Sequence, residues 1–306
     1  MELTSLFFAA FALSTATAEL IELSYTYNVD APTSPKLTQF THKIVKKGLN
    51  KFGIWVELNE FCASEHSGTH VDAPVHFAEK GWALEAIPTK RLWRVPAVVI
   101  DVSNQIKLSK NVLNYEIKVK DLEDWEAVNG IIPDATLVLI RTGWGAKVNN
   151  LREYSGLDQH NKNNFPGLGK GAAEWLANHG NKHGHETGVI GVGIDTISVD
   201  VGQSVRYPSH VALYTKNIYG IENMANLDKL PVKGAIVTVL PMRIGGGSGA
   251  PARIIAEVGE EHQLTSASPK SNQSLAVMLV AQMITALALV MAAFLVLSRR
   301  RTLRTT

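Results

Sequence analysis

Apolar and polar positions follow two patterns along this chain, and both are typical of strands. Residues 21–25 alternate apolar and polar side chains, as a strand with one buried face does. Other stretches are short and continuously apolar, as strands buried on both faces are; they lie at residues 95–102, 135–140, 187–195, 235–240 and 252–258. Because a few helical segments separate these strands, the pattern predicts an α/β fold with a mixed sheet.

The expected helices are marked by their ends. Asp121 stands at the start of one helix, where a carboxylate caps free N–H groups and complements the helix dipole. A second helix is expected at residues 170–179, ended by Gly180. A third begins beyond Pro208 and continues to residue 216, which would place His210 in its first turn.

Each end of the chain contains an apolar segment that resembles a targeting or membrane segment rather than a strand of the folded domain. Residues 6–13 form a short apolar run, and Ala16 and Ala18 provide a small-x-small cleavage site, so a signal peptide is expected. Residues 275–297 carry no charge, and at about 1.5 Å per residue a helix there would span roughly 34 Å, enough to cross a bilayer of about 30 Å. The predicted organisation is a signal peptide (1–18), a folded domain (19–258), a polar linker (259–274), a transmembrane helix (275–297) and a basic cytoplasmic tail (298–306).

This organisation predicts a single-pass type I membrane protein of the secretory pathway, with the folded domain extracellular or lumenal. Arg299, Arg300, Arg301 and Arg304 would stay in the cytosol under the positive-inside preference. The alternative is a GPI signal, since a polar spacer precedes an apolar tail. Such tails end with the apolar run, whereas this chain continues beyond it, so the single-pass anchor is favoured.

Charge and cysteine content exclude two classes of protein. The net charge is +2, with much of the basic excess after residue 298, so the folded domain carries no signal for nucleic-acid binding. The single cysteine, Cys62, excludes an intrachain disulfide. We expect Cys62 to be a buried structural thiol rather than a metal ligand.

The densest chemistry lies in residues 66–76, which hold His66, His70, Asp72 and His76. Neutral imidazole nitrogens and carboxylate oxygens suit Zn, Mn or Fe. If residues 70–72 are extended, side chains two apart share one face, so His70 and Asp72 point together. Three ligands and a water would leave an open coordination position, as in a catalytic site.

Two residues that shape the backbone make this geometry plausible. Gly68 permits a bend or a close approach, which lets His66 return to the same centre. Pro74 supplies no N–H group and ends the strand, so His76 lies beyond the ligand cluster. The stretch therefore predicts a metal site with an additional histidine beside it.

The spacing His-x-Gly-Thr-His-x-Asp-x-Pro-x-His in residues 66–76 resembles the signature of the cyclase-like metal hydrolases, the family of bacterial kynurenine formamidase and isatin hydrolase. The second ligand segment of that family, a His followed twelve residues later by a Glu, is matched by His210 and Glu222. The resemblance covers roughly residues 20–258, and further similar stretches lie at residues 141–144, 165–168, 193–196 and 246–251.

The resemblance implies a swivelling β/β/α fold with a partly barrel-like sheet, and commonly a homodimer. It implies one or two divalent ions, Zn or Mn, held by five ligands: His66, His70, Asp72, His210 and Glu222. His76 corresponds to the acid/base of the family, a role that suits an imidazole with a pKa near 6.5.

The implied reaction is hydrolysis of a C–N bond in a small-molecule amide, with conversion of N-formylkynurenine to kynurenine and formate as the first candidate. Isatin-like cyclic amides are the alternative, because the loop at residues 31–35 lacks the tryptophan that packs on the aromatic substrate in kynurenine formamidases. A metal-dependent lyase or dehydratase would use the same ligands. A non-catalytic, membrane-tethered binding protein is disfavoured, because binding alone gives no reason for six intact site residues.

Several smaller features carry their own expectations. His179, His183 and His185 form a second histidine cluster, but Asn, Gly and Lys interrupt it, so a solvated loop is favoured over a second metal site. By position in the resembling family, Asp195 and Asp200 would support the site, although loop-capping acids are an equal alternative. The glycine-rich residues 245–249 lack the Lys-Ser/Thr of a phosphate-binding loop, so we expect a tight connection near the site.

Overall fold

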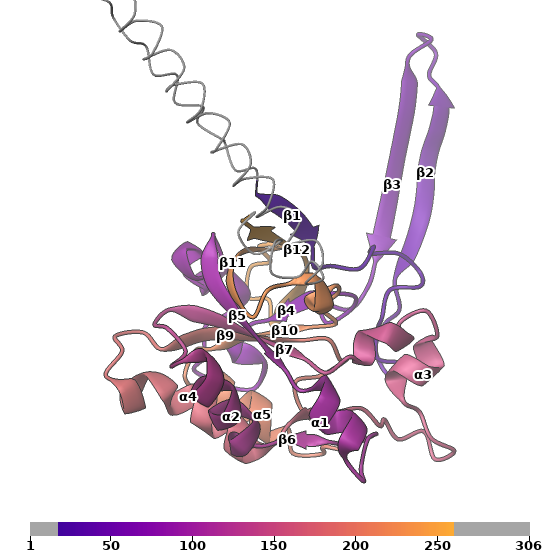
Figure 1. Cartoon of the computed structure of the whole chain (residues 1–306). Coiled ribbons are helices and arrows are strands. Elements are labelled where there is room, and N and C mark those ends of the chain that lie inside the picture. Colours follow the sequence, from indigo (N-terminus) through magenta and orange to yellow (C-terminus); the bar gives the residue numbers. More distant parts are fainter. Residues whose placement is uncertain (1–17, 260–306) are drawn as a thin grey trace, which may run out of the picture. The chain divides into compact units, whose positions relative to one another are not determined.

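A sheet that closes on itself organises the structure, a computed structural model that describes residues 18–259 (Figure 1). Strand β4 (His70–Asp72) pairs with β10 on one side and with β12 on the other, and this closes a ring. Around the ring the strands follow the order β12 (Gly249–Val258), β11 (Lys233–Pro241), β5 (Val95–Asp101), β7 (Thr136–Arg141), β9 (Val189–Ile194), β10 (Tyr219–Glu222) and β4. β1 (Glu19–Glu22) adds to the edge of β12. The pairs among β5, β7, β9 and β10 are parallel and the others antiparallel, so the predicted mixed, partly barrel-like sheet is confirmed.

Alternating side chains of the parallel strands divide the apolar residues between two cores. Leu137 and Leu139 of β7 pack in the cluster enclosed by the ring, whereas Val138 and Ile140 pack against the helices. All four side chains are fully buried. This explains why the strand is apolar at every position rather than at every second one.

The helices gather along one side of the sheet, which Figure 1 shows for α1, α2, α4 and α5. Their bounds are α1 (Ser103–Leu108), α2 (Val119–Asn129), α4 (Lys170–His183) and α5 (Pro208–Tyr214), with α3 (Leu151–Ser155) lying apart. Short strands β6 (Glu116–Ile117) and β8 (Gly167–Leu168) pair with each other, and single 3₁₀ turns include Pro74–His76, Leu84–Ala86, Thr89–Arg91, Trp144–Lys147 and Leu227–Lys229. At the start of α2, Asp121 accepts the backbone N–H of Lys118, as expected from its position.

The helix expected at 170–179 extends beyond Gly180, so its predicted end was wrong. α4 continues to His183 and ends at Gly184, whose φ of 67° places it in the left-handed region that a helix C-cap requires. Gly180 has a different role, since a Cβ atom there would lie 2.7 Å from the Cα atom of Gly188. It permits close packing of the helix against the segment that enters β9. His179 and His183 are consequently helical residues, and the expectation of a solvated loop was wrong for them.

A long hairpin, β2 (Thr41–Leu49) with β3 (Trp55–Cys62), projects away from the sheet (Figure 1). Its side chains are almost all exposed, including the large apolar residues Phe52, Trp55 and Phe61. Cys62 ends the hairpin and is exposed, so the predicted buried thiol was wrong. Cys62 lies on a two-stranded ribbon without a second sheet layer, so its side chain stays exposed although Tyr27 and Phe40 pack beside the neighbouring Phe61.

The localisation predicted from the sequence needs a correction. Within residues 18–259, no helix combines the length and the hydropathy needed to cross a bilayer, and the longest of the α-helices named above, α4, has 14 residues. The prediction of a single-pass type I membrane protein is corrected accordingly: the described residues contain no membrane-spanning helix of the kind that it requires. The segments on which it was based, the signal peptide before Ala18 and residues 260–306 with the expected span and tail, lie outside the described residues.

Candidate functional site

Strand β4 positions the first two candidate ligands. Its three residues are fully buried between β10 and β12, and His70 lies directly across from Glu222 in the antiparallel pairing with β10. His70 and Asp72 share one face because side chains alternate along a strand. Two candidate ligands of β4 and one of β10 therefore point to the same place without any long-range adjustment.

Two neighbouring segments bring in the other imidazoles. Gly68, with a φ of 65°, turns the chain between His66 and β4, and a Cβ atom there would lie 2.7 Å from the ring of Tyr27. His210 lies in the first turn of α5, as predicted, behind Pro208 at the helix start. Thus residues from a turn, two strands and a helix converge.

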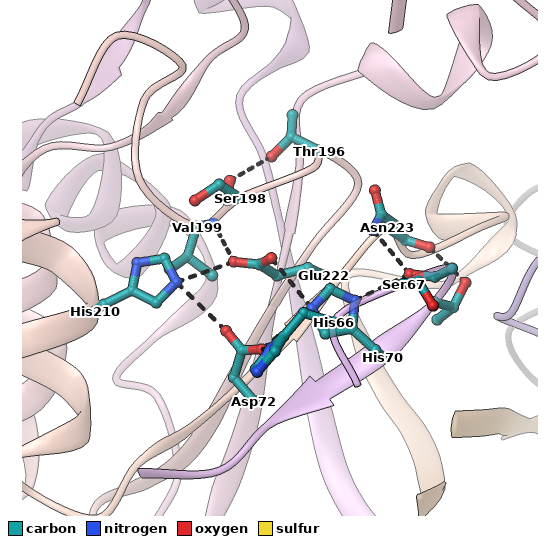
Figure 2. A network of polar contacts seen from close by, with 12 residues as sticks. His66, Ser67, His70, Asp72, Thr196, Ser198, Val199, His210, Glu222 and Asn223 are labelled. Carbon is teal, nitrogen blue, oxygen red and sulfur yellow. Dashed lines mark hydrogen bonds and ion pairs between the residues drawn. The ribbon is translucent and has the colours of Figure 1, made fainter. Parts of the chain in front are cut away.

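The converging side chains form one network of polar contacts (Figure 2). His66 Nδ1 lies 2.7 Å from Asp72 Oδ1, and His70 Nε2 lies 3.1 Å from the same oxygen and 3.4 Å from Glu222 Oε2. His210 Nε2 lies 3.4 Å from Asp72 Oδ2 and 3.2 Å from Glu222 Oε1. The structure thus brings together all five residues that the sequence suggested as ligands, and their role as ligands stays a prediction.

Mutual contacts control the charges in this network. Burial alone would lower the pKa of His70, but the carboxylates of Asp72 and Glu222 outweigh it and raise that pKa to about 10. Burial likewise opposes the charge on His210, whose pKa is raised well above its usual value by Asp200, Asp72 and Glu222. The pKa of Asp72 lies well below its usual value because the histidines outweigh its burial. Positive charge, supplied by protons on the histidines or by a metal ion, therefore stabilises the buried carboxylates.

His70 shows why these residues fit a divalent ion. Its Nδ1 contacts the Gly68 carbonyl at 3.0 Å, which orients Nε2 toward Asp72 and Glu222. Among the described residues, Nε2 has no well-aligned hydrogen-bond partner although it is buried and faces two carboxylates. A nitrogen in that position suits metal coordination, and the surrounding nitrogen and oxygen donors suit Zn or Mn.

Two residues hold candidate ligands from behind. Asp200 Oδ2 lies 2.6 Å from His210 Nδ1, and it also accepts the backbone N–H of that residue. This is the carboxylate–histidine arrangement that fixes the tautomer of a metal-binding imidazole. Tyr214 lies one turn further along α5 and donates its hydroxyl to Asp72 Oδ2, with 2.7 Å between the two oxygens. Tyr214 was missed in the sequence, although its position four residues after His210 places both on one helix face.

His66 is held by residues from the glycine-rich connection. Its Nε2 lies 2.9 Å from Ser248 Oγ, and Ser248 in turn donates its hydroxyl and its backbone N–H to Glu65. The expectation of a tight connection near the site is thereby confirmed. Ser248 lies in the family-like stretch 246–251, but no signal in the sequence indicated its contact with Glu65, which joins residues more than 180 positions apart.

Asp195 and Asp200, which the sequence treated alike, have different roles. Asp200 contacts His210, as described above. Asp195 instead accepts hydrogen bonds from the Thr142 hydroxyl and from the N–H groups of Thr142 and Gly143, and so caps the turn after β7. It also lines a separate cavity of about 520 Å³ that contains none of the five candidate ligands.

His76 lies beside the ligands, on the 3₁₀ turn that Pro74 begins. Its ring stacks on His66 with centroids 3.9 Å apart, and one of its nitrogens lies within 4.8 Å of donor atoms of His66 and Asp72. Burial lowers the pKa of His76 to about 4, with a further lowering by His66 and His210 that the carboxylates partly oppose. The ring is therefore neutral at pH 7 and has a lone pair available for a proton.

A cavity of about 330 Å³ opens next to these groups. His66, His76 and His210 line it together with Glu222, so the candidate ligands and the candidate acid/base face one space. The remaining lining is partly aromatic and apolar, from side chains that include Phe77, Phe165, Ile197 and Tyr207. A small molecule with an aromatic or apolar body and a polar reacting group matches such a lining.

Comparison with known proteins gives this arrangement a family. The family model Cyclase, described as "Putative cyclase", matches residues 21–201. An isatin hydrolase of Roseibium aggregatum is 31% identical over 235 residues, which cover 74% of this chain and 83% of that protein. The chain belongs to the cyclase family.

Two more similar proteins extend this comparison. A kynurenine formamidase of Bacillus cereus is 26% identical over 239 residues, covering 78% of this chain and 97% of that protein. The solved structure of isatin hydrolase A from Ralstonia solanacearum superimposes with a TM-score of 0.69 at 31% identity, covering 79% of this chain and 92% of that one. The family resemblance inferred from residues 66–76 is thus confirmed.

Proposed function

We propose that residues 19–258 form a metal-dependent hydrolase that cleaves a C–N bond in a small amide. The observation that carries this proposal is the convergence of His66, His70, Asp72, His210 and Glu222 on one buried centre at the wall of a cavity. The names of two relatives support the reaction class, because an isatin hydrolase and a kynurenine formamidase both hydrolyse an amide C–N bond.

Each residue has a part in the proposed mechanism. A divalent ion held by the five ligands would lower the pKa of water from about 15.7 toward 7 and polarise the amide carbonyl. His76, neutral and beside the ligands, takes a proton from water as the water oxygen attacks the carbonyl carbon. His76 then returns that proton to the amide nitrogen as the C–N bond breaks, leaving an amine and a carboxylic acid, which loses its proton to solvent at pH 7. Asp200 and Tyr214 keep His210 and Asp72 in position throughout.

Among amides, we favour a cyclic aromatic amide of the isatin type over N-formylkynurenine. The isatin hydrolase named above is more similar to this chain than the kynurenine formamidase is, at 31% against 26% identity. The loop at residues 31–35 has no tryptophan, and the aromatic lining comes instead from residues such as Phe77 and Phe165. N-formylkynurenine remains the second candidate, because the match to that formamidase spans 97% of its length.

The test is turnover by the full chain after its metal has been removed and then restored with Zn²⁺ or Mn²⁺. Isatin, N-formylkynurenine and a set of hydroxy acids are supplied in parallel, and opening of the amide is followed by absorbance and mass spectrometry. We expect metal-dependent hydrolysis of isatin, with slower or no hydrolysis of the formamide. Elimination of water from a hydroxy acid without amide hydrolysis would instead identify a lyase, and turnover that resists complete chelation would contradict the proposal.

We further propose that the protein forms a homodimer. The projecting hairpin β2–β3 supports this, because it exposes Phe52, Trp55 and Phe61 on a ribbon with no layer of its own to cover them. Sedimentation of the wild type against a Phe52→Ser/Trp55→Ser variant measures the state directly. If the variant and the wild type have the same sedimentation coefficient, the hairpin does not contribute to a dimer interface.

A further inference from the structure

A second group of metal-type side chains lies at the end of α4, apart from the centre described above. It precedes β9, whereas Asp195 and Asp200 follow the other end of that strand. The six residues of β9 extend over roughly 20 Å at about 3.3 Å per residue, so the two groups are separated by about the length of the strand. Any ion bound here would therefore be distinct from an ion at the catalytic centre.

Two elements supply three of the donors. His179 and His183 are four residues apart on α4 and share one helix face, with ring centroids 4.5 Å apart. Glu126 reaches them from α2, and its Oε1 lies 2.8 Å from His179 Nε2. Donor atoms of all three residues lie within 4.8 Å of one another. Ligands of a tetrahedral Zn²⁺ ion lie about 2.0–2.2 Å from the metal, so only small side-chain shifts would bring these atoms around one ion.

A fourth imidazole stands beside them. His185 follows the helix cap Gly184, and its backbone N–H is bound by the Gly180 carbonyl at 2.9 Å. This bond holds the segment against α4, and the His185 ring centroid lies 5.8 Å from that of His179 and 6.0 Å from that of His183. The position of His185 is therefore fixed by the fold rather than by a contact of its ring.

Unpartnered nitrogens distinguish this cluster from an ordinary hydrogen-bonded one. Among residues 18–259, no hydrogen-bond partner is present for buried nitrogens on all three rings: His179 Nδ1, His183 Nε2 and His185 Nδ1. His179 is the decisive case, because only 1% of the residue is exposed. Buried polar atoms in folded proteins are almost always bonded, and those that are not call for an unseen water or ion.

We propose that Glu126, His179 and His183 form a binding site for a divalent transition-metal ion of the Zn²⁺ type, with His185 adjacent as a further ligand. Imidazole ligands select Zn²⁺, Cu²⁺ or Ni²⁺ over Mg²⁺ and Ca²⁺, which prefer oxygen. The contact between Glu126 Oε1 and His179 Nε2 places the carboxylate beside both imidazoles, where it can serve as an oxygen ligand of the same ion.

The surroundings favour a cation here. The C-terminal end of α4 carries the negative end of the helix dipole, and Glu126 adds a carboxylate. Burial lowers the pKa of His179, so the ring is neutral and its lone pair is free at pH 7. A bound ion would link the end of α2, the end of α4 and the segment that enters β9.

Tryptophan fluorescence offers a local readout. The ring of Trp175 lies 4.8 Å from that of His179, one turn earlier on α4. Co²⁺ quenches a nearby indole, so its binding at this cluster should reduce the emission of Trp175. A Trp175→Phe variant identifies which part of the total signal comes from this residue.

The experiment uses the full chain without a polyhistidine tag, stripped of metal and then equilibrated with Zn²⁺ or Co²⁺. Bound Zn²⁺ per chain is measured by mass spectrometry for the wild type, His183→Ala and Glu126→Gln. His160→Ala is the matched control, because His160 is exposed and lies outside both clusters. Circular dichroism checks that each variant is folded, and isatin turnover checks that the catalytic centre is intact.

We expect His183→Ala to bind one Zn²⁺ fewer per chain than the wild type and to lose the Co²⁺ quenching of Trp175, with turnover within about twofold. Glu126→Gln should bind the same ion with affinity reduced on the order of 10–100-fold. The proposal is overturned if His183→Ala and the wild type hold equal numbers of ions, or if Co²⁺ quenching is the same in both. The comparison is a difference between variants, so the number of ions at the catalytic centre does not affect it.

Discussion

The domain contains two histidine–carboxylate clusters that are built in opposite ways. In the proposed catalytic cluster, formed by His66, His70, Asp72, His210 and Glu222, candidate ligands come from a turn, two strands and a helix, and Asp200, Tyr214 and Ser248 contact them from outside. In the α4 cluster, two imidazoles come from one helix, and buried ring nitrogens lack partners among the described residues. Within residues 18–259, one buried imidazole nitrogen of the first cluster, His70 Nε2, lacks a hydrogen-bond partner, whereas in the second cluster one nitrogen on each of three rings does, so the second cluster has fewer protein contacts to replace an ion.

The largest expected effect distinguishes the two clusters by their metal content. Asp72→Ala should remove the ions of the catalytic centre, because Asp72 contacts His66, His70 and His210. Turnover should fall on the order of 10⁴-fold, since metal activation contributes several kcal/mol and about 1.4 kcal/mol corresponds to a factor of ten. Mass spectrometry should still find the ion of the α4 cluster. An exposed acid on α2, changed in Asp124→Ala, is the control and should alter neither quantity.

The next effect separates proton transfer from metal binding within the catalytic centre. His76→Ala should retain its ions and its fold while turnover falls on the order of 10³-fold, within the range expected for a positioned acid/base. Metal analysis and turnover are measured on the same preparation. Unchanged turnover would show that the proton goes elsewhere, and loss of an ion would make His76 a ligand, which its distance from His66 and Asp72 permits.

A smaller effect tests the residues that hold ligands from behind. Asp200→Asn should weaken metal binding on the order of 10–100-fold, because it removes the charge that orients His210. Asp195→Asn is a matched control: it is also buried and follows β9, but it caps the turn at Thr142 and Gly143. Competition with a fluorescent chelator measures both affinities. Equal weakening in the two variants would mean that general destabilisation, rather than the contact with His210, is responsible.

The smallest effect concerns the segment that carries His185. Asp134 accepts backbone N–H groups of Thr187 and Gly188, and although burial opposes its charge, these bonds lower the pKa of Asp134 below 3.8. Asp134→Asn should lower the melting temperature by roughly 2–4 °C, the shift expected for the loss of a hydrogen bond in a domain of this size.

The pH dependence of this difference has a fixed sign. A carboxyl group whose pKa is lowered by folding stabilises the native state above its unfolded pKa, and this contribution is lost as the pH falls. Melting temperatures of the wild type and of Asp134→Asn should therefore differ at pH 7 and converge as the pH falls below about 4. A gap that stays constant between pH 7 and pH 3 would exclude the charge of Asp134 as its cause.

Local patterns were sufficient to predict the elements that carry the catalytic cluster. The alternation of His70 and Asp72, the end of the strand at Pro74 and the position of His210 in the first turn of a helix all follow from short-range rules. They succeed because a strand of three residues and a helix start are defined by their own sequence. Closure of the ring was implied only by family resemblance, since the pairs of β4 with β10 and β12 join residues far apart in the chain.

Where prediction failed, a tertiary contact or its absence was the reason. Glycine is common just after a helix end, but at position 180 the missing side chain lets Gly188 approach α4. The helix continues through Gly180 to His183. That misjudgement left His183 outside the helix and favoured a solvated loop over a metal site for the cluster of His179, His183 and His185. Cys is a residue type that is often buried, yet Cys62 is exposed at the end of a two-stranded ribbon. Neither outcome can be derived from neighbouring residues alone.

The position of β4 in the ring also sets the order in which the protein can be assembled during synthesis. Residues 70–72 leave the ribosome early, but their partners in β12, residues 249–251, are made roughly 180 residues later. At about 5–20 residues per second, this delay is on the order of 10–35 s. The other neighbour of β4, residues 219–222 of β10, is made roughly 150 residues after it, so Asp72 and His70 have neither neighbouring strand for most of that interval. The segment with the highest density of candidate metal ligands is thus made long before the strands that bury it.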